Sequence, residues 1–320
     1  MSLYGFALIS SPIRIATNLP YVIDQYLKID KPTSLQLSQI RKYLSNLNKS
    51  NDFRRPFENI NYLESEDKSR NIDIVTIGSK KLKKRDWLYY VVKYKTEKYH
   101  SIETPSLNLS NLQLSAVLQE KQIRINPVFC NKAYYCWSNF TEDYDYYFRI
   151  HTKSIENNIW YLEDLNRLKS TYDKINSIMI SYEDIYRSIK MYYSLPKLTG
   201  YDEFMTLGLF SIIESILTHN PKSDVDSIGH QITSKVKLLS NRFTNKIDYS
   251  FFHNVNHNNI WKKLYEYRSK IAHGGRIDFK NSLKMLEDSY TVQQFLEMFL
   301  KLLLRSALNE PQLYLDLKEC

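Results

Sequence analysis

The chain has 320 residues, of which 43% are hydrophobic and 25% charged, and this balance excludes a disordered or fibrous protein. Its formal net charge of +9 favours a polyanionic partner, through counterion release, where the positive charges cluster. No apolar run approaches the roughly 18 residues that a membrane span needs, and no basic segment precedes a long apolar one at the start, so we expect a cytoplasmic protein with no membrane partner.

The cysteines are too few for a disulfide framework, which fits a reducing cytosol. They are Cys130, Cys136 and Cys320. A zinc site would need the first two to meet His100 or His151 through the fold, and we expect instead that Cys130 and Cys136 are buried strand residues. The sequence also lacks the glycine-rich loops that bind nucleotide phosphates. We therefore expect no metal and no cofactor.

The N-terminal part of the chain carries short apolar runs rich in β-branched and aromatic residues. These runs predict strands at 72–77, 87–94, 123–129 and 146–150. Helical patterns interrupt them near residues 33–48 and 110–120. We predict an α+β domain over residues 1–152.

A basic run precedes the predicted strand at 87–94 and consists of Lys80, Lys81, Lys83, Lys84 and Arg85. It is a candidate for contacts with RNA phosphates, and the alternative is a solvated loop before a strand. The chain also has 26 tyrosines, which offer stacking faces for unpaired bases or simply reflect the bias of an AT-rich coding sequence.

The remaining chain changes to a helical period. Apolar residues recur at three-and-four spacing in segments 159–193, 201–219, 225–243, 258–273 and 280–308. Breakers separate these segments, among them S-L-P-K-L-T-G and the G-G pair after His273. The sequence therefore predicts an all-α helical bundle over residues 153–320.

The segment W-K-K-L-Y-E-Y-R-S-K-I-A-H-G-G poses the main functional question. Its apolar stripe is Ile260, Leu264, Tyr267 and Ile271. On an ideal helix Arg268 lies roughly 70° from the centre of this stripe and His273 about 150° from it. His273 is therefore not a core residue of its own subunit. Gly274 or Gly275 can take the left-handed conformation that ends a helix, which places His273 in the last turn.

Arginine and histidine together suit the cleavage of a phosphodiester without a metal. Arginine supplies a permanent forked charge for the phosphate, and histidine exchanges protons near neutral pH. Because Arg268 and His273 diverge by about 140° on one helix, we expect a homodimer in which two such segments meet around one site. The alternative is that Arg268 pairs with a surface carboxylate and His273 only caps the helix.

Three further residues are candidates for the same site. Glu214 is the only charge within L-F-S-I-I-E-S-I-L, and we expect it to pair with Arg268, the alternative being a solvent-facing Glu214 beside Ser211 and Ser215. Tyr265 lies near His273 on the wheel and would stack a base or brace a partner subunit. The histidines of H-N-V-N-H, residues 253–257, would approach as a loop.

The block from about residue 200 to 278 resembles the Apea-like HEPN family, through G-L-F-S-I-I-E-S-I-L, Q-I-T-S-K-V-K-L-L and L-Y-E-Y-R-S-K-I-A-H-G-G. The resemblance implies an HEPN-type helical bundle that dimerises. It also implies that Arg268 and His273 match the family's catalytic pair and that Ser269 stands at its polar position. Lys270 and Arg276, beside the pair, are further candidates for RNA contacts.

The resemblance implies a function as well. We expect a metal-independent endoribonuclease in which the RNA 2′-hydroxyl attacks and a 2′,3′-cyclic phosphate remains. The setting implied is a toxin or an antiviral defence effector of the abortive-infection type. The resemblance does not extend to the substrate or the trigger, and the RNA that we expect as a partner would be tRNA or other cellular or phage RNA. A phage-encoded trigger or an antitoxin would be its partner, and the N-terminal domain would sense a trigger or select RNA. The alternative is a non-catalytic module for RNA or nucleotide binding or for dimerisation.

Overall fold

The chain is a mixed α+β protein, as the sequence predicts. The computed structural model describes residues 3–9, 11, 13–40, 60–64, 73–77, 80–82, 90–96, 107–121, 123–130, 136–137, 159–198, 203–221, 227–252 and 256–319. Of residues 60–64, 73–77, 80–82 and 136–137 it describes the backbone alone.

The chain divides into two compact units, Met1–Tyr172 and Asp173–Cys320. The predicted boundary at residues 152 and 153 differs from this division. Residues that follow the predicted boundary, among them Trp160, Leu165 and Leu168, belong to the hydrophobic core of the first unit. The boundary therefore falls inside the helix α4 (Leu162–Ser181).

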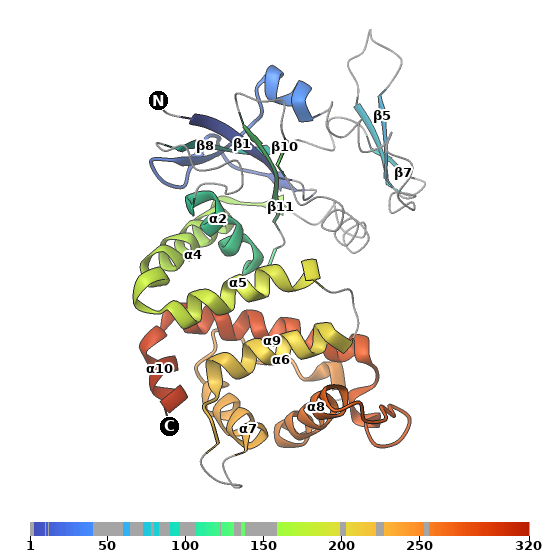
Figure 1. Cartoon of the computed structure of the whole chain (residues 1–320). Coiled ribbons are helices and arrows are strands. Elements are labelled where there is room, and N and C mark those ends of the chain that lie inside the picture. Colours follow the sequence, from blue (N-terminus) through green and yellow to red (C-terminus); the bar gives the residue numbers. More distant parts are fainter. Residues whose placement is uncertain are drawn as a thin grey trace. The chain divides into compact units, whose positions relative to one another are not determined.

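The first unit contains an antiparallel sheet with the strand order β10-β9-β1-β8-β4-β3 (Figure 1). These strands are β1 (Leu3–Ile9), β3 (Tyr21–Val22), β4 (Leu27–Asp30), β8 (Tyr90–Thr96), β9 (Ile125–Cys130) and β10 (Cys136–Trp137). A second sheet pairs β2 (Arg14–Ile15) in parallel with β11 (Ile159–Trp160). A third has the order β5 (Ile60–Glu64), β6 (Asp73–Ile77) and β7 (Lys80–Leu82).

The strands predicted at 72–77, 87–94 and 123–129 are confirmed as β6, β8 and β9. The helix predicted at 110–120 is α2 (Leu107–Val117). Residues 34–40 are helical as predicted, and the rest of that segment lies outside the described residues, as does the strand predicted at 146–150. Sequence analysis missed β1, whose apolar residues Phe6, Ala7, Leu8 and Ile9 are all buried. A strand buried on both faces lacks the polar alternation that identifies a strand.

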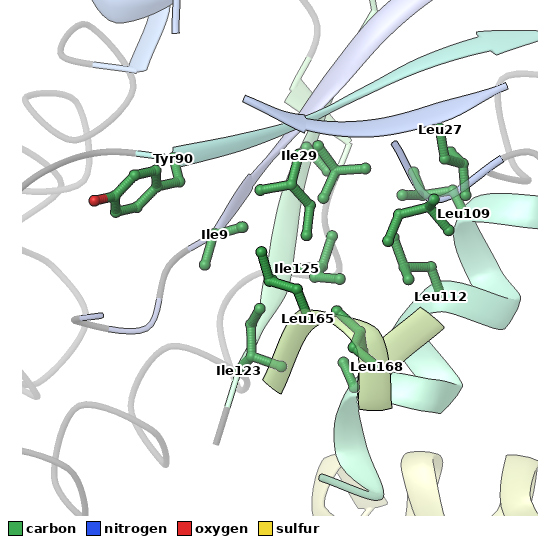
Figure 2. Packing of buried hydrophobic residues seen from close by; sticks show 14 of the residues in the cluster. Ile9, Leu27, Ile29, Tyr90, Leu109, Leu112, Ile123, Ile125, Leu165 and Leu168 are labelled. Carbon is green, nitrogen blue, oxygen red and sulfur yellow. The ribbon is translucent and has the colours of Figure 1, made fainter. Parts of the chain in front are cut away.

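One hydrophobic core holds the first unit together. Figure 2 shows the side chains of Leu109 and Leu112 from α2 beside those of Leu165 and Leu168 from α4, facing Ile29 of β4. All five of these side chains are fully buried. The core also takes Ala7 and Ile9 from β1 and Val92 from β8, alternate residues that share one face of the sheet.

The secondary structure in the described residues of the second unit consists of helices. After α4 come α5 (Glu183–Leu198), α6 (Glu203–Leu217), α7 (Ile228–Leu239), α8 (His257–Ala272), α9 (Ser289–Asn309) and α10 (Pro311–Glu319). Short 3₁₀ turns lie at Ser250–Phe252 and Lys284–Leu286. The predicted helices 201–219, 225–243 and 258–273 correspond to α6, α7 and α8. No described helix is long and apolar enough to span a membrane.

Four details of the helical segments differ from the prediction. The segment 159–193 is divided by a turn at Tyr182, and α5 continues past Pro196 to Leu198. The segment 280–308 becomes helical only at Ser289, because the Asp288 side chain caps α9 by accepting a hydrogen bond from the Thr291 amide at 2.7 Å. Sequence analysis also missed α10.

Helix α6 is the centre of the second unit and packs against α5, α7, α8, α9 and α10 (Figure 1). It accordingly carries a nearly continuous apolar sequence, of which Leu209, Phe210 and Ile213 are fully buried. A buried polar contact links it to α9, where the Gln293 side-chain amide donates to the Thr206 hydroxyl at 3.3 Å. A charged side chain in the middle of α6 therefore has mostly apolar neighbours.

The carboxyl of Glu297 on α9 makes the stability depend on pH. Burial raises its pKa to about 7, and the charge of Lys301 opposes this shift only in part. Because the unfolded chain releases this proton near its ordinary pKa of 4.5, the contribution of Glu297 to stability falls as the pH rises from there through 7.

We therefore expect Glu297→Gln to raise the free energy of unfolding by on the order of 2 kcal/mol at pH 8, and by less at pH 5. Urea denaturation at both pH values measures it. The exposed Glu319→Gln is the control and should change neither value. A gain that is equal at the two pH values would contradict this assignment.

Candidate functional site

Helix α8 carries most of the candidate residues, and both its ends are defined by specific contacts. At its start, the Asn256 side chain accepts a hydrogen bond from the Asn258 amide at 2.9 Å. The predicted stripe residues Ile260, Leu264 and Tyr267 are 0% exposed, and Trp261 joins them at 1%. The fourth, Ile271, lies in the last turn and is only partly buried, which corrects its prediction as a core residue.

The end of α8 confirms the glycine stop. Gly274 has a φ of 66°, in the left-handed region, and no other glycine among the described residues has a positive φ. The Gly275 amide donates to the Lys270 carbonyl at 2.7 Å and the Gly274 amide to the Ile271 carbonyl at 3.3 Å. This pair of bonds is a Schellman motif, so the helix ends at Ala272 with His273 as its C-cap. The His273 side chain is exposed.

Arg268 forms the predicted ion pair with Glu214 of α6. Its Nη2 donates a hydrogen bond to Oε2 of Glu214 at 3.0 Å. Its Nε lies 3.0 Å from Oε1 of the same carboxylate, at an angle too oblique for a hydrogen bond, so this second contact is ionic. The two side chains are 23% and 15% exposed, which excludes the alternative of a solvent-facing Glu214. The Ser215 hydroxyl instead contacts the Ser188 hydroxyl at 3.1 Å.

Tyr265 lies beside this ion pair. The Cζ atom of Arg268 is 5.8 Å from the centre of the Tyr265 ring. Burial raises the pKa of the Tyr265 hydroxyl, and the negative charge of Glu214 adds to the shift. The ring also packs close to Gly229 of α7, where an added Cβ would lie 2.7 Å from its Cδ1, and sequence analysis missed this residue. The signal that was available is a glycine inside a predicted helix of a chain with only seven glycines.

Two further candidates on α8, Ser269 and Lys270, make contacts of their own within the chain. Ser269 is partly buried, and its carbonyl accepts a hydrogen bond from the His273 amide at 3.1 Å. Lys270 is engaged within the chain, through an ion pair with Glu266 at 3.0 Å and a hydrogen bond to the Ser282 hydroxyl at 2.8 Å. Lys270 is therefore not a free cation for RNA.

Arg276 is exposed in the turn that follows α8. The Asn281 side chain lowers the pKa of the Asp278 carboxyl by donating a hydrogen bond, and the charge of Arg276 adds to this effect. Of the basic run, the backbone of Lys80 and Lys81 belongs to β7. The side chains of the run and the whole of residues 83–85 lie outside the described residues.

His257 does not belong to the site. It is the first residue of α8, about 16 Å along the axis from Arg268. Its Nδ1 bonds to the Tyr249 hydroxyl and its Nε2 lies 3.3 Å from the Thr233 carbonyl. Burial lowers its pKa. The role of His257 is therefore to anchor the start of α8, and residues 253–255 lie outside the described residues.

The arrangement offers a guanidinium cation and an imidazole near one helix end. Glu214 engages one edge of the guanidinium, so the opposite edge keeps N–H donors for a ligand. Among the described residues, no hydrogen bond occupies the His273 imidazole. The described residues also contain no group of three or more His, Cys, Asp or Glu side chains that could hold a metal ion.

Comparison of the chain with family profiles, with curated proteins and with solved structures finds no match. The resemblance to the Apea-like HEPN family therefore rests on the residues of this sequence, and membership of that family stays a prediction. The positions of Glu214, Tyr265, Arg268 and His273 bear on the function independently of that resemblance.

The left-handed Gly274 leads to a test of the helix end. We expect Gly274→Ala to destabilise the protein by about 1 kcal/mol, because a side chain at positive φ is strained. The matched control is Gly275→Ala, whose added Cβ would lie 3.4 Å from the nearest atom, an ordinary contact. Thermal denaturation of the two variants measures the difference, and equal midpoints would contradict the role of Gly274.

Proposed function

We propose that the chain is a metal-independent endoribonuclease whose site is completed by a second copy of itself. The observation that carries this proposal is the pairing of Arg268 with Glu214, one turn before an exposed His273 at the end of the same helix. A cation held in place by a carboxylate, with free donors on its other edge, suits a phosphate. An exposed imidazole suits proton transfer near neutral pH.

The reaction that fits these groups is transesterification within the RNA strand. The 2′-hydroxyl loses its proton to a base and its oxygen forms a new bond to phosphorus. The bond from phosphorus to the 5′-oxygen then breaks, and that oxygen takes up a proton. In this scheme Arg268 stabilises the charge of the pentavalent phosphate and His273 moves a proton. The products are a 2′,3′-cyclic phosphate and a 5′-hydroxyl.

A second copy is needed because of the helix geometry. Positions 268 and 273 diverge by about 140° around α8, so both side chains of one copy point away from a common phosphate. A two-fold axis near the end of α8 would bring two arginines and two histidines together. Such an isologous contact is the most common symmetric arrangement of two identical chains.

The biological setting is part of the same proposal and follows from the resemblance. The homodimer would be a cytoplasmic toxin or antiviral effector that arrests growth by cutting tRNA or other cellular or phage RNA. The first unit, with the basic run at Lys80, would sense the trigger or select the RNA. The formal charge of +9 supports a polyanionic substrate.

Cleavage of total RNA in the presence of EDTA tests the chemistry. We expect the wild-type protein to cut, and His273→Ala and Arg268→Ala each to lower the rate by about 100-fold or more. Mass spectrometry should find a 2′,3′-cyclic phosphate at the new ends. Arg187→Ala, on the exposed face of α5, is the control and should keep full activity. Equal cleavage by His273→Ala, or cleavage only with a divalent metal, rejects the proposal, and binding without cleavage favours the non-catalytic module.

Mixing two inactive variants tests the shared site. Arg268→Ala homodimers keep only histidines and His273→Ala homodimers only arginines, whereas a mixed dimer has one of each on different copies. We expect subunit exchange between the two variants to restore part of the activity. Native mass spectrometry confirms that mixed dimers have formed. Mixed dimers without activity, or a monomer in solution, would show that the site is not shared.

A further inference from the structure

The ring of Tyr265 packs against Gly229 of α7, a residue that has no side chain. A Cβ atom added to Gly229 would lie 2.7 Å from Cδ1 of Tyr265 and 3.1 Å from its Cγ and Cε1. Gly229 does not have a positive φ, so the backbone does not require glycine there. Glycine is also a poor helix former compared with alanine. The physical reason for this glycine is therefore the space that the Tyr265 ring takes up.

The first turn of α7 is fixed relative to the end of α6, so it forms a firm support for the ring. The Ser227 hydroxyl caps α7 by accepting from the His230 amide at 3.4 Å. The buried Gln231 side chain accepts from the His219 amide at 3.0 Å and donates to the His219 carbonyl at 3.3 Å. His219 lies just beyond the end of α6. These two hydrogen bonds therefore tie α7 to the helix that carries Glu214.

The ring also lies next to the ion pair. The Cζ atom of Arg268 is 5.8 Å from the ring centre, within the range of a cation–π contact. Glu214 holds the guanidinium through one hydrogen bond and one ionic contact, and the ring adds a further contact to the same group. The Tyr265 ring is partly buried beside Gly229 and Arg268, so a base stacked on it, which was one expectation for Tyr265, would have to fit next to both residues.

We propose that Tyr265, seated on Gly229, is a positioning residue that fixes the orientation of the Arg268 guanidinium. The site would then be supported by three helices, through Glu214 of α6, Gly229 of α7 and Arg268 itself on α8. The consequence for cleavage rests on the proposed function. The consequence for the mobility of Arg268 does not.

A double-mutant cycle on Gly229 and Tyr265 tests this proposal. NMR of the Arg268 Nε–H group reports its solvent exchange and chemical shift in the full chain, with Arg268→Lys used to assign the signal. We expect Gly229→Ala and Tyr265→Leu each to speed this exchange by about tenfold. Because both act through the same ring, the double variant should be no worse than either single one. Tyr265→Phe keeps the ring and should restore slow exchange.

Cleavage assays of the same variants separate the two proposals. A lower kcat with little change in KM, in parallel with faster exchange at Arg268, supports positioning for the reaction. If no variant and not even the wild type cleaves RNA, the proposed function fails while the NMR result still decides the positioning. Unchanged Arg268 exchange in Gly229→Ala, or an effect that persists in the Tyr265→Leu background, would overturn the inference. Thermal midpoints identify a variant that does not fold, and the comparison of Tyr265→Leu with Tyr265→Phe then decides alone.

Discussion

The ion pair between Glu214 and Arg268 is the constraint on which the site depends. Glu214 belongs to α6, the helix that packs against every neighbouring helix from α5 to α10, and a carboxylate there is costly unless a cation meets it. Arg268 follows Tyr267 directly, and Tyr267 is fully buried. One residue therefore points into the core while the next reaches Glu214, and together they fix the rotation of α8 about its axis.

The position of His273 follows from this fixed rotation. The start of α8 is held by the Asn256 cap and by the contacts of His257, and its end by the Schellman motif at Gly274. Because the rotation of α8 and its last residue, Ala272, are both fixed, the side of the helix from which the His273 side chain leaves is fixed as well. That side is exposed. The result is an anchored cation and an accessible imidazole whose backbone positions on α8 are fixed, although the two side chains leave the helix in different directions.

Sequence patterns predicted this part of the molecule well because its constraints are local. The apolar period identified α6, α7 and α8, the G-G pair identified the helix end, and a lone carboxylate in an apolar helix identified the partner of Arg268. The failures have a different origin. Strand β1 is buried on both faces and shows no alternation, and β2, β3 and β11 have only two residues each. The boundary inside α4 was missed because an amphipathic helix has the same period whichever core it covers. Gly229 was missed because a sequence does not show which side chain needs the space.

In the proposed dimer, an Arg268 side chain that is already held in place would favour catalysis. A guanidinium already held by Glu214 and Tyr265 loses little freedom when a phosphate binds, so binding energy remains available for the transition state. Among the described residues none supports the His273 imidazole in this way, and its side chain is exposed to water. In the proposed dimer the second copy would both exclude that water and bring its own anchored arginine to the same phosphate, so the imidazole would act beside a cation that its own helix directs elsewhere. In the proposed function, the divergence of the two side chains on α8 is the reason that the site would need two chains.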